Sequence, residues 1–357
     1  MVLTLTSKLL RSAATGDLLR SGTTGKPLRK GYANVWVFDP ANGQWLGDFC
    51  TGNSPRDLAR DASGNTYVAG VASLLAYGAH KISPTGNLLW RTDLFTNAYG
   101  VAAGTGFTVW ATARQGTPPA TLWKLDDDGN EIWRLDPYDA GSRGTAARVD
   151  SGGNILFLAV GGYYGNNLYL WKMDSGGNLQ WSRDVHISPA AYDPNHSMTI
   201  DAAGNAYVVG RAWSFSEGEI RKYDPSGGLV LSCSYYGAMY GGNDVAVGPS
   251  GNIYITRWCW DLAPVGCVRA HNSTGDVLWT KVGSTNQEYG WGITVDSGEN
   301  IYFGKDSSLF KLDSSGATIW SRPVSSAGKV ASLTFGSNGL LYVISTSTIC
   351  GTLEGTP

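Results

Sequence analysis

Residues 201–208 read DAAGNAYV and residues 172–181 read KMDSGGNLQW, and variants of both stretches return along most of the chain. Further copies of the two stretches begin at Asp61, Gly248, Asp296, Lys124 and Lys311. Internal periods of this kind indicate an array of similar units, in which each unit buries its apolar face against its neighbours. The two stretches therefore predict a repeat fold.

The spacing of the repeats has the length of a propeller blade. The position of Asn65 is occupied again, at intervals of 40 to 51 residues, by Thr108, Asn154, Asn205, Asn252, Asn300 and Leu340. Four-stranded blades have this length. The alternation of apolar and polar residues between Asp/Asn/Gly turns also indicates strands and hairpins. We therefore expect an all-β, seven-bladed β-propeller.

The seventh unit is split between the two ends of the chain. Residues 333–344 supply two inner strands without partners after them, and residues 35–49 supply a third and a fourth strand with none before them. Joining the two halves closes the ring and removes open sheet edges. We expect Val35–Phe49 to pair with Leu340–Ile344, so that residues 35–357 form the propeller and residues 1–34 form an extended arm.

A tryptophan recurs at a fixed place of the outer strand in five of the seven units. The set consists of Trp90, Trp133, Trp181, Trp279 and Trp320, with Leu46 and Leu231 in the two other units. An aromatic side chain at a fixed place in most blades is best explained as a packing wedge that buries ~150–250 Å² against the next blade.

The repeats resemble those of known propeller families. The D-x-x-G-N-x-Y-V stretch resembles NHL and SBBP repeats, and the K-x-D-x-x-G-x-x-x-W stretch resembles the tryptophan-docking motif of PQQ-type propellers, over residues 35–350. The resemblance implies the fold but no one activity, because these families include scaffolds, receptors, RNA binders and enzymes. The adjacent cysteine pair of PQQ enzymes is missing here, so we expect no cofactor.

Composition and charge exclude several classes of function. The net charge is −2 and no Lys/Arg run is longer than Arg29-Lys30, which argues against nucleic-acid binding. No apolar stretch has the length of a membrane span, and Val2–Leu5 is too short for a signal-peptide core. Only 16% of residues are charged, against ~25% in typical soluble domains. Such a surface is typical of virion-borne or extracellular β proteins.

Five cysteines are an odd number, so at least one is unpaired within the chain. Cys50 and Cys350 follow strands of the split unit and are one candidate disulfide. Cys259 and Cys267 flank a variable loop and are another. Free thiols remain the alternative for both pairs, because bridging needs a short Cα separation.

The first 34 residues do not fit the blade pattern. Residues 9–17 read LLRSAATGD and residues 18–26 read LLRSGTTGK, in a segment with six Lys/Arg and one acidic residue. A disordered tail and a strap that docks on a partner are both compatible with this composition. The expected contacts of a strap are Leu9, Leu10, Arg11, Leu18, Leu19, Arg20 and Lys26.

The sequence contains none of the common catalytic motifs, and we expect no catalytic residues. His186, Asp193 and His196 share one loop, but ligand spacing in a loop is unspecific, so no metal site is expected. Asp126–Asn130 resembles part of a calcium loop but stands where other units have their hairpin turn.

Aromatic residues mixed with Asn, Asp and Gly gather in the variable loops, and such surfaces suit protein or glycan contacts. The expected binding face consists of Tyr99, Tyr138, Tyr192, Tyr236, Tyr240, Tyr289, Trp291, Trp258 and Trp260.

These observations favour a non-enzymatic structural or attachment propeller, with a phage virion or tail as its expected location and an extracellular location as the alternative. Its expected partners are other structural proteins of an assembly, together with a surface glycan or receptor. A carbohydrate-binding lectin is one alternative. A lyase or glycosidase with carboxylates at the channel mouth is another, with Glu288, Asp193 and Asp244 as candidates.

Overall fold

The computed structural model describes most of the repeat region and two short N-terminal strands. The described residues are 3–6, 9–12, 34–50, 54–71, 78–85, 87–94, 96–113, 120–136, 143–161, 167–187, 198–211, 217–236, 242–257, 267–281, 290–305, 307–324 and 329–345.

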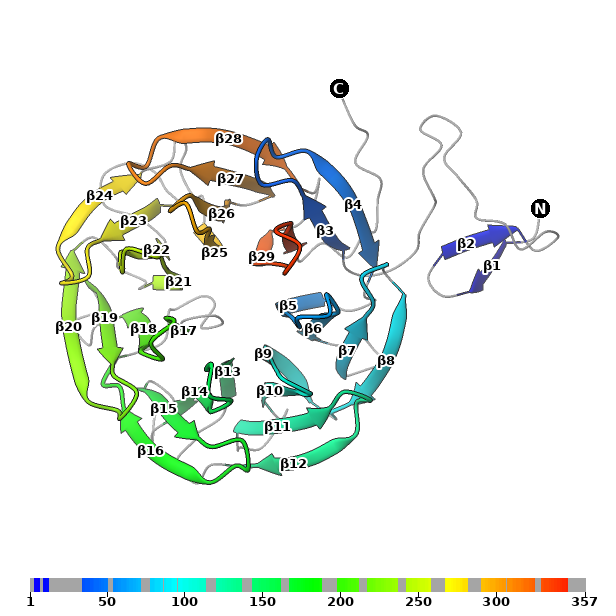
Figure 1. Ribbon diagram of the computed structural model, residues 1–357, viewed down its shortest axis with the longest axis horizontal. Coiled ribbons are helices and arrows are strands. Elements are labelled where there is room, and N and C mark those ends of the chain that lie inside the picture. Colours follow the sequence, from blue (N-terminus) through cyan, green and yellow to red (C-terminus); the bar gives the residue numbers. More distant parts are fainter. Residues whose placement is uncertain are drawn as a thin grey trace.

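Seven four-stranded antiparallel sheets stand as blades around a central axis in the described part of the chain (Figure 1). Blades 1 to 3 consist of β5 (Ser54–Arg60), β6 (Thr66–Val71), β7 (Gly78–Ile82), β8 (Leu88–Asp93), β9 (Asn97–Gly104), β10 (Phe107–Ala113), β11 (Ala120–Asp126), β12 (Glu131–Leu135), β13 (Arg143–Val149), β14 (Ile155–Gly161), β15 (Asn167–Met173) and β16 (Leu179–Asp184). Blades 4 to 6 consist of β17 (Met198–Ile200), β18 (Ala206–Arg211), β19 (Glu217–Tyr223), β20 (Leu229–Tyr236), β21 (Gly242–Val247), β22 (Ile253–Arg257), β23 (Cys267–His271), β24 (Val277–Lys281), β25 (Gly290–Val295), β26 (Ile301–Lys305), β27 (Ser308–Leu312) and β28 (Thr318–Pro323). The predicted all-β, seven-bladed fold is confirmed.

Blade 7 is assembled from both ends of the repeat region, as predicted. Its strands, from the axis outward, are β29 (Val330–Phe335), β30 (Leu341–Ser345), β3 (Asn34–Phe38) and β4 (Trp45–Cys50). The joint is the antiparallel pair β3–β30, in which Val35 lies opposite Ile344 and Val37 lies opposite Tyr342. The ring is therefore closed by backbone hydrogen bonds between the first and last repeats.

The D-x-x-G-N turn is held by its aspartate. In blade 1, Asp61 accepts the backbone N–H of Asn65 at 2.8 Å, its side-chain amide at 2.8 Å and the Tyr67 hydroxyl at 3.0 Å. Gly64 has φ +82°, a left-handed conformation that glycine adopts without a steric penalty. The recurring letters of the repeat thus correspond to side-chain bonds and to one special backbone angle.

Blade 5 has Gly248 in place of this aspartate, and a side chain from blade 6 accepts the tyrosine hydroxyl and holds the turn instead. Glu299 accepts the backbone N–H of Ser250 at 3.1 Å, the Ser250 hydroxyl at 2.6 Å and the Tyr254 hydroxyl at 2.9 Å. Glu299 itself has φ +64° where other blades have glycine. The departure from the repeat in blade 6 therefore compensates for the departure in blade 5.

Lysine and tryptophan of the second repeat stretch join blades 1, 2 and 3 each to the next blade. Lys172 Nζ at 3.3 Å and Trp181 Nε1 at 3.0 Å both donate to the carbonyl oxygen of Pro225 in blade 4. A Cβ at Gly227 would come within 2.8 Å of the Trp181 ring, so glycine lets the indole lie on the turn. Equivalent pairs are Lys81 and Trp90 on Asp127, and Lys124 and Trp133 on Ser175. The predicted wedge role of the tryptophans is confirmed.

The apolar core lies between neighbouring blades and not on the axis. Val109 of blade 2 packs in one cluster with Phe157 and Trp171 of blade 3. Val35 and Ile344 of blade 7 pack with Val68 of blade 1 in the same way. Because the cores are interfacial, the inner strands remain free to line an axial channel.

The N-terminal region contributes a small hairpin. β1 (Leu3–Thr6) pairs antiparallel with β2 (Leu9–Ser12), with Leu10 opposite Leu5 and Arg11 opposite Thr4. The first LLRS copy of the predicted arm therefore has the expected extended backbone, but it pairs locally. The second copy, with Leu18, Leu19, Arg20 and Lys26, lies outside the described residues.

Candidate functional site

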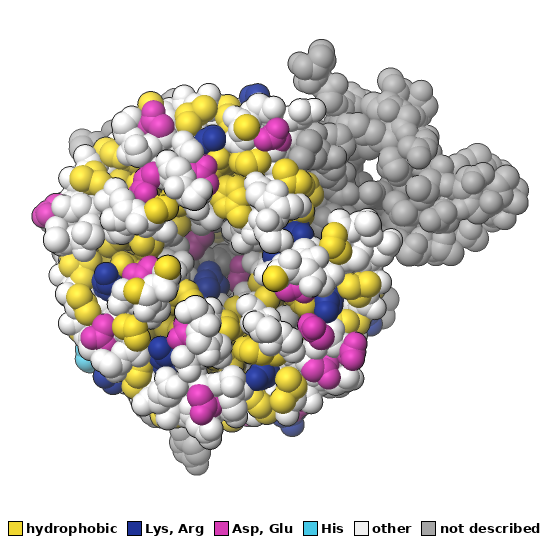
Figure 2. Space-filling model, in the orientation of Figure 1, with side chains coloured by type: hydrophobic (Ala, Val, Ile, Leu, Met, Phe, Trp, Pro, Cys, Tyr) yellow, Lys and Arg dark blue, Asp and Glu magenta, His cyan; other side chains and the backbone are white. Residues whose placement is uncertain are grey.

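A cavity of about 320 Å³ lies on the propeller axis and is lined by the inner strands of all seven blades. Figure 2 shows the hollow in the middle of one face, with acidic and basic side chains visible inside it. Channels of this kind are frequent ligand sites, because loops and inner strands of many blades converge there.

Seven structurally equivalent positions form a ring in this cavity. Each lies opposite the same second-strand position, as Ala59 does with Tyr67, and Thr294 does with Tyr302. All seven line the cavity: Ala59, Ala102, Arg148, Thr199, Ala246, Thr294 and Thr334. Six of the seven side chains are alanine or threonine, so Arg148 is the one large and charged member of the ring.

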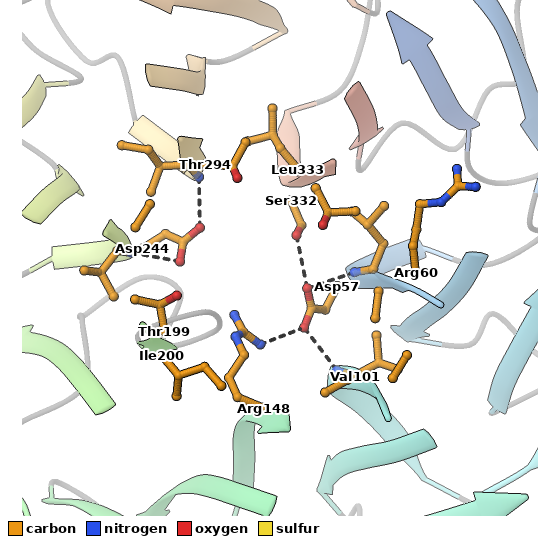
Figure 3. A pocket seen from close by; sticks show the side chains of 18 of the residues that line it. Asp57, Arg60, Val101, Arg148, Thr199, Ile200, Asp244, Thr294, Ser332 and Leu333 are labelled. Atoms are coloured by element: carbon orange, nitrogen blue, oxygen red, sulfur yellow. Dashed lines mark hydrogen bonds and ion pairs between the residues drawn. The ribbon is translucent and has the colours of Figure 1, made fainter. Parts of the chain in front are cut away.

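Two aspartates beside the ring link neighbouring blades (Figure 3). Asp57 of β5 is 2% exposed. It accepts the backbone N–H of Leu58 at 2.8 Å, the hydroxyl of Ser332 from blade 7 at 3.0 Å and the backbone N–H of Val101 from blade 2 at 3.0 Å. The carboxylate therefore joins three blades.

Asp244 of β21 repeats this arrangement on the opposite side of the ring. It accepts the backbone N–H of Val245 at 2.8 Å and that of Ile293 in blade 6 at 2.9 Å. Gly292 precedes Ile293, and a Cβ at Gly292 would come within 2.8 Å of the Ser332 Cα in blade 7. Glycine therefore lets the two inner strands approach each other. Of the predicted channel-mouth carboxylates, Asp244 thus lines the cavity as an inter-blade link, whereas Glu288 and Asp193 lie outside the described residues.

Arg148 of β13 reaches into the cavity from blade 3 (Figure 3). Its Nη1 donates to the carbonyl oxygen of Ala147 at 2.8 Å and lies 3.6 Å from Asp57 Oδ2. The side chain is 23% exposed. An Arg–Asp ion pair therefore crosses the channel from blade 3 to blade 1.

The outer strand of blade 4 differs from the other outer strands. β20 reads LVLSCSYY and contains neither a charged residue nor a proline, whereas each of β4, β8, β12, β16, β24 and β28 contains at least one. Leu229 and Val230 at its start are 51% and 58% exposed. Edge strands normally carry charge or proline because their unpaired backbone groups otherwise recruit further strands.

Blade 4 also lacks the tryptophan link to its neighbour. Leu231 replaces the indole, and Lys222 Nζ lies 5.0 Å from the Tyr207 ring of its own blade. Cys233 packs toward Gly275 of blade 5 and is partly buried. Burial raises the pKa of Cys233 to about 11, so the thiol stays protonated at neutral pH and is a poor nucleophile.

Three of the predicted loop aromatics lie in strands. Tyr99 and Trp291 occupy equivalent β-bulges of β9 and β25, and each has a cation from the next blade over its ring. Arg143 lies 5.4 Å from the Tyr99 ring, and Lys329 lies 4.3 Å from the Trp291 ring. The loop assignment was wrong because a bulge interrupts the alternation that marks a strand.

The third strand aromatic is Tyr236, at the end of β20. The other members of the predicted face lie outside the described residues: Tyr138, Tyr192, Tyr240, Tyr289, Trp258 and Trp260. Each candidate disulfide also has one cysteine outside the described residues, Cys350 in one pair and Cys259 in the other. Their proposed partners are Cys50 at the end of β4 and Cys267 at the start of β23. These assignments remain predictions.

The described residues contain no group of three potential metal ligands. His186 is exposed, has φ +52° and lies 3.5 Å from Asp184, while Asp193 and His196 lie outside the described residues. Asp126 forms the hairpin turn with Asn130 that the repeat predicts. In the same part of the chain, no helix has the length and hydropathy of a membrane span.

Asp57 and Arg148 are functional candidates that the sequence analysis missed. Asp57 stands where blades 2 and 6 have Gly100 and Gly292, a position that blade 5 also fills with an aspartate. Arg148 stands where the other blades have alanine or threonine. An alignment of the seven inner strands would have shown both as departures. Bulges of one residue blur that alignment in the sequence.

The fold and its lysine–tryptophan links define a seven-bladed propeller of the tryptophan-docked class. The family model described as outer membrane protein assembly factor BamB matches residues 71–245 and 265–352. These residues are more than half of the chain, and the protein belongs to this family.

Solved structures with the same fold come from several contexts. Kuenenia stuttgartiensis hydrazine synthase has a TM-score of 0.67 at 12% identity, over 80% of this chain and 91% of that one. BamB from Moraxella catarrhalis has a TM-score of 0.56 at 14% identity, over 96% of this chain and 100% of that one. A functionally unknown protein from Desulfotomaculum acetoxidans has a TM-score of 0.57 at 13% identity, over 82% and 95%. No curated protein matches the chain. At these identities the likeness concerns the fold alone.

Proposed function

We propose that the protein is a non-enzymatic structural propeller that joins a larger protein assembly, with the edge of β20 as a contact strand. The observation that carries the proposal is the unprotected edge: β20 has eight residues, no charge and no proline. Its free N–H and C=O groups suit pairing with another strand. The family description, an assembly factor, agrees with a role among other proteins.

The expected occupant of this edge is β20 of a second copy. Antiparallel pairing of a strand with its own copy is two-fold symmetric, so a single edge suffices to form a closed dimer. Every molecule of the protein carries this edge, so its partner must be available to every molecule. A second copy of the chain meets this condition. The neutral side chains Val230, Ser232 and Ser234 would then meet without like-charge repulsion.

The channel supports the non-enzymatic part of the proposal. Asp57 and Asp244, the carboxylates of the cavity with described geometry, each accept backbone N–H groups from two blades. A general acid or base must exchange protons with a substrate. The oxygens of these two carboxylates are instead occupied by hydrogen bonds that hold neighbouring blades together.

The test compares two substitutions at equivalent positions of the outer strands. Ser232→Lys places a charge on β20, and Ser321→Lys places one on β28, which already carries Arg322. We expect sedimentation velocity to show a dimer for the wild type and the Ser321→Lys variant, and a monomer for Ser232→Lys. A wild type that stays monomeric at all concentrations, or a Ser232→Lys variant that dimerises as well as the wild type, would refute the proposed edge.

The arm and the aromatic loops complete the proposal. Residues 1–34 would dock on neighbouring proteins of the assembly, and the loop aromatics would contact a surface glycan or receptor. We further propose a phage virion or tail as the assembly, supported by the low charge and the strap-like repeats, with an extracellular location as the alternative. A glycan array combined with lyase and glycosidase assays separates attachment from the lectin and enzyme alternatives.

A further inference from the structure

The ring around the axial cavity is asymmetric in one place only. Arg148 projects among six alanine and threonine side chains that leave the middle of the cavity open. A side chain that served only to fill the channel would not need a charge, because leucine or methionine fills space without desolvating one. The position of Arg148 therefore needs a chemical explanation.

The described contacts of Arg148 use one of its three nitrogens. Nη1 donates to Ala147 and faces Asp57. Within the described part of the chain, no hydrogen bond or ion pair engages Nε or Nη2. A guanidinium presents these two nitrogens along one edge with parallel N–H bonds. Arg148 therefore offers an unused two-donor edge inside the cavity.

The other charged side chains of the cavity are either hydrogen-bonded or buried. Asp57 accepts three hydrogen bonds and Asp244 accepts two, mostly from backbone N–H groups. Arg60 lies over the Tyr342 ring at 3.5 Å and donates to the carbonyl oxygen of Gly64. Burial lowers the pKa of Arg60. Its Nε and Nη1 have no hydrogen-bond partner among the described residues, but both atoms are buried, so they are closed to a ligand in the cavity. Arg148 is the cation left to meet a ligand.

We propose that the axial cavity binds the carboxylate of an acidic sugar, held in a bidentate manner by Arg148. Carboxylates match the Nε–Nη2 edge with two parallel hydrogen bonds, which a neutral sugar does not provide. The Thr199, Thr294 and Thr334 hydroxyls on the ring can bond to sugar hydroxyl groups. A cavity of about 320 Å³ suits a single monosaccharide. The site is independent of the β20 edge.

The experiment titrates the full chain with sodium glucuronate, and with glucose as a neutral sugar of equal size. We expect calorimetry to show that the protein binds glucuronate at least tenfold more tightly than glucose. The affinity for glucuronate should fall as the salt concentration rises. Arg148→Gln should lose this preference. The control is Arg134→Gln on the outer strand β12, which should bind as the wild type does.

Arg148→Lys separates a loss of binding from a loss of folding, because it preserves the positive charge opposite Asp57 and removes only the planar two-donor edge. It should fold as the wild type does and bind glucuronate several-fold more weakly. A side-chain ¹⁵N spectrum should show one arginine Nε resonance that shifts with glucuronate and is missing in Arg148→Lys. No preference over glucose, or an unchanged affinity in both Arg148 variants, would overturn the proposal.

A further arm of the experiment distinguishes a free acid from a glycan terminus. The same titration uses an oligosaccharide that ends in glucuronate. Equal or tighter binding of the oligosaccharide identifies the site as a glycan-end reader with access from the disc face. Binding of the monosaccharide alone identifies a site for the free acid. Either result supports the carboxylate site, and the absence of both overturns it.

Discussion

At the scale of residues, the repeat letters are a set of hydrogen-bonded side chains. Asp150 in blade 3 accepts the backbone N–H and the amide of Asn154, and it pairs with Lys172 at 3.1 Å. Lys172 in turn donates to Pro225 of blade 4. Burial alone would raise the pKa of Asp150, but the bonds from Asn154 and Lys172 outweigh it and hold the pKa below the ordinary 3.8.

Asp150→Asn should destabilise the protein by about 3 kcal/mol at pH 7, because the buried Lys172 ammonium loses its counter-charge. A carboxyl group with a lowered pKa in the folded state stabilises it above its unfolded pKa and stops doing so as pH falls through the folded value. The difference between wild type and Asp150→Asn should thus begin to shrink near pH 4 and disappear below the folded pKa of Asp150.

Urea titrations from pH 7 to pH 3 measure this difference, with the exposed Asp128→Asn as the matched control. Asp128→Asn should stay within ~0.5 kcal/mol of the wild type at each pH, as expected for a surface substitution. A difference for Asp150→Asn that does not change with pH would show that the pair with Lys172 contributes little.

At the scale of elements, each blade is stable because it lies on its neighbour. Trp181 in β16 donates to Pro225 of blade 4, and its ring covers Gly227 in the same turn. The link depends on two separable parts, a hydrogen bond and an area of aromatic contact.

Trp181→Phe and Trp181→Ala separate these two parts. The phenylalanine variant keeps most of the ring and loses the N–H donor, which should cost about 1 kcal/mol. The alanine variant also loses the ring, and because Trp181 is only half-buried, its cost should be about 3 kcal/mol, at the low end for aromatic truncation. Urea unfolding midpoints give both values. Equal losses in the two variants would show that the hydrogen bond, and not the ring, joins the blades.

The sequence predicted the number of blades, the closure and the tryptophan links, because the turn and wedge residues recur in most units at similar spacings. It did not predict which residues line the axis. The inner strands contain bulges, at Arg56 and Tyr99 among others, and each bulge shifts the register by one residue. The role of Glu299 was equally out of reach, because the gap that it fills at Gly248 lies in another blade.

At the scale of the molecule, the ring is closed by the β3–β30 pair, where the first and last repeats share a sheet. Blades that lean on each other in a closed ring have no free end from which to unfold. Removal of β29 and β30 would expose Val35 and Trp36, which are buried against Ile344 and Val343 in the intact protein. It would also leave β3 and β4 without inner partners.

A chain cut after residue 328 should therefore lose its single cooperative transition, whereas a chain cut after Gly351 keeps β29, β30 and Cys350 and should melt as the full chain does. The reason is that loss of the closing pair opens both of its neighbours, blade 6 and blade 1, and makes the remaining array unravel from its ends. Calorimetry reports the outcome as the ratio of van't Hoff to calorimetric enthalpy, near one for the longer chain and well below one for the shorter. A 1–328 chain that unfolds as sharply as the full chain would mean that six blades hold together without closure, and that the shared sheet has another purpose.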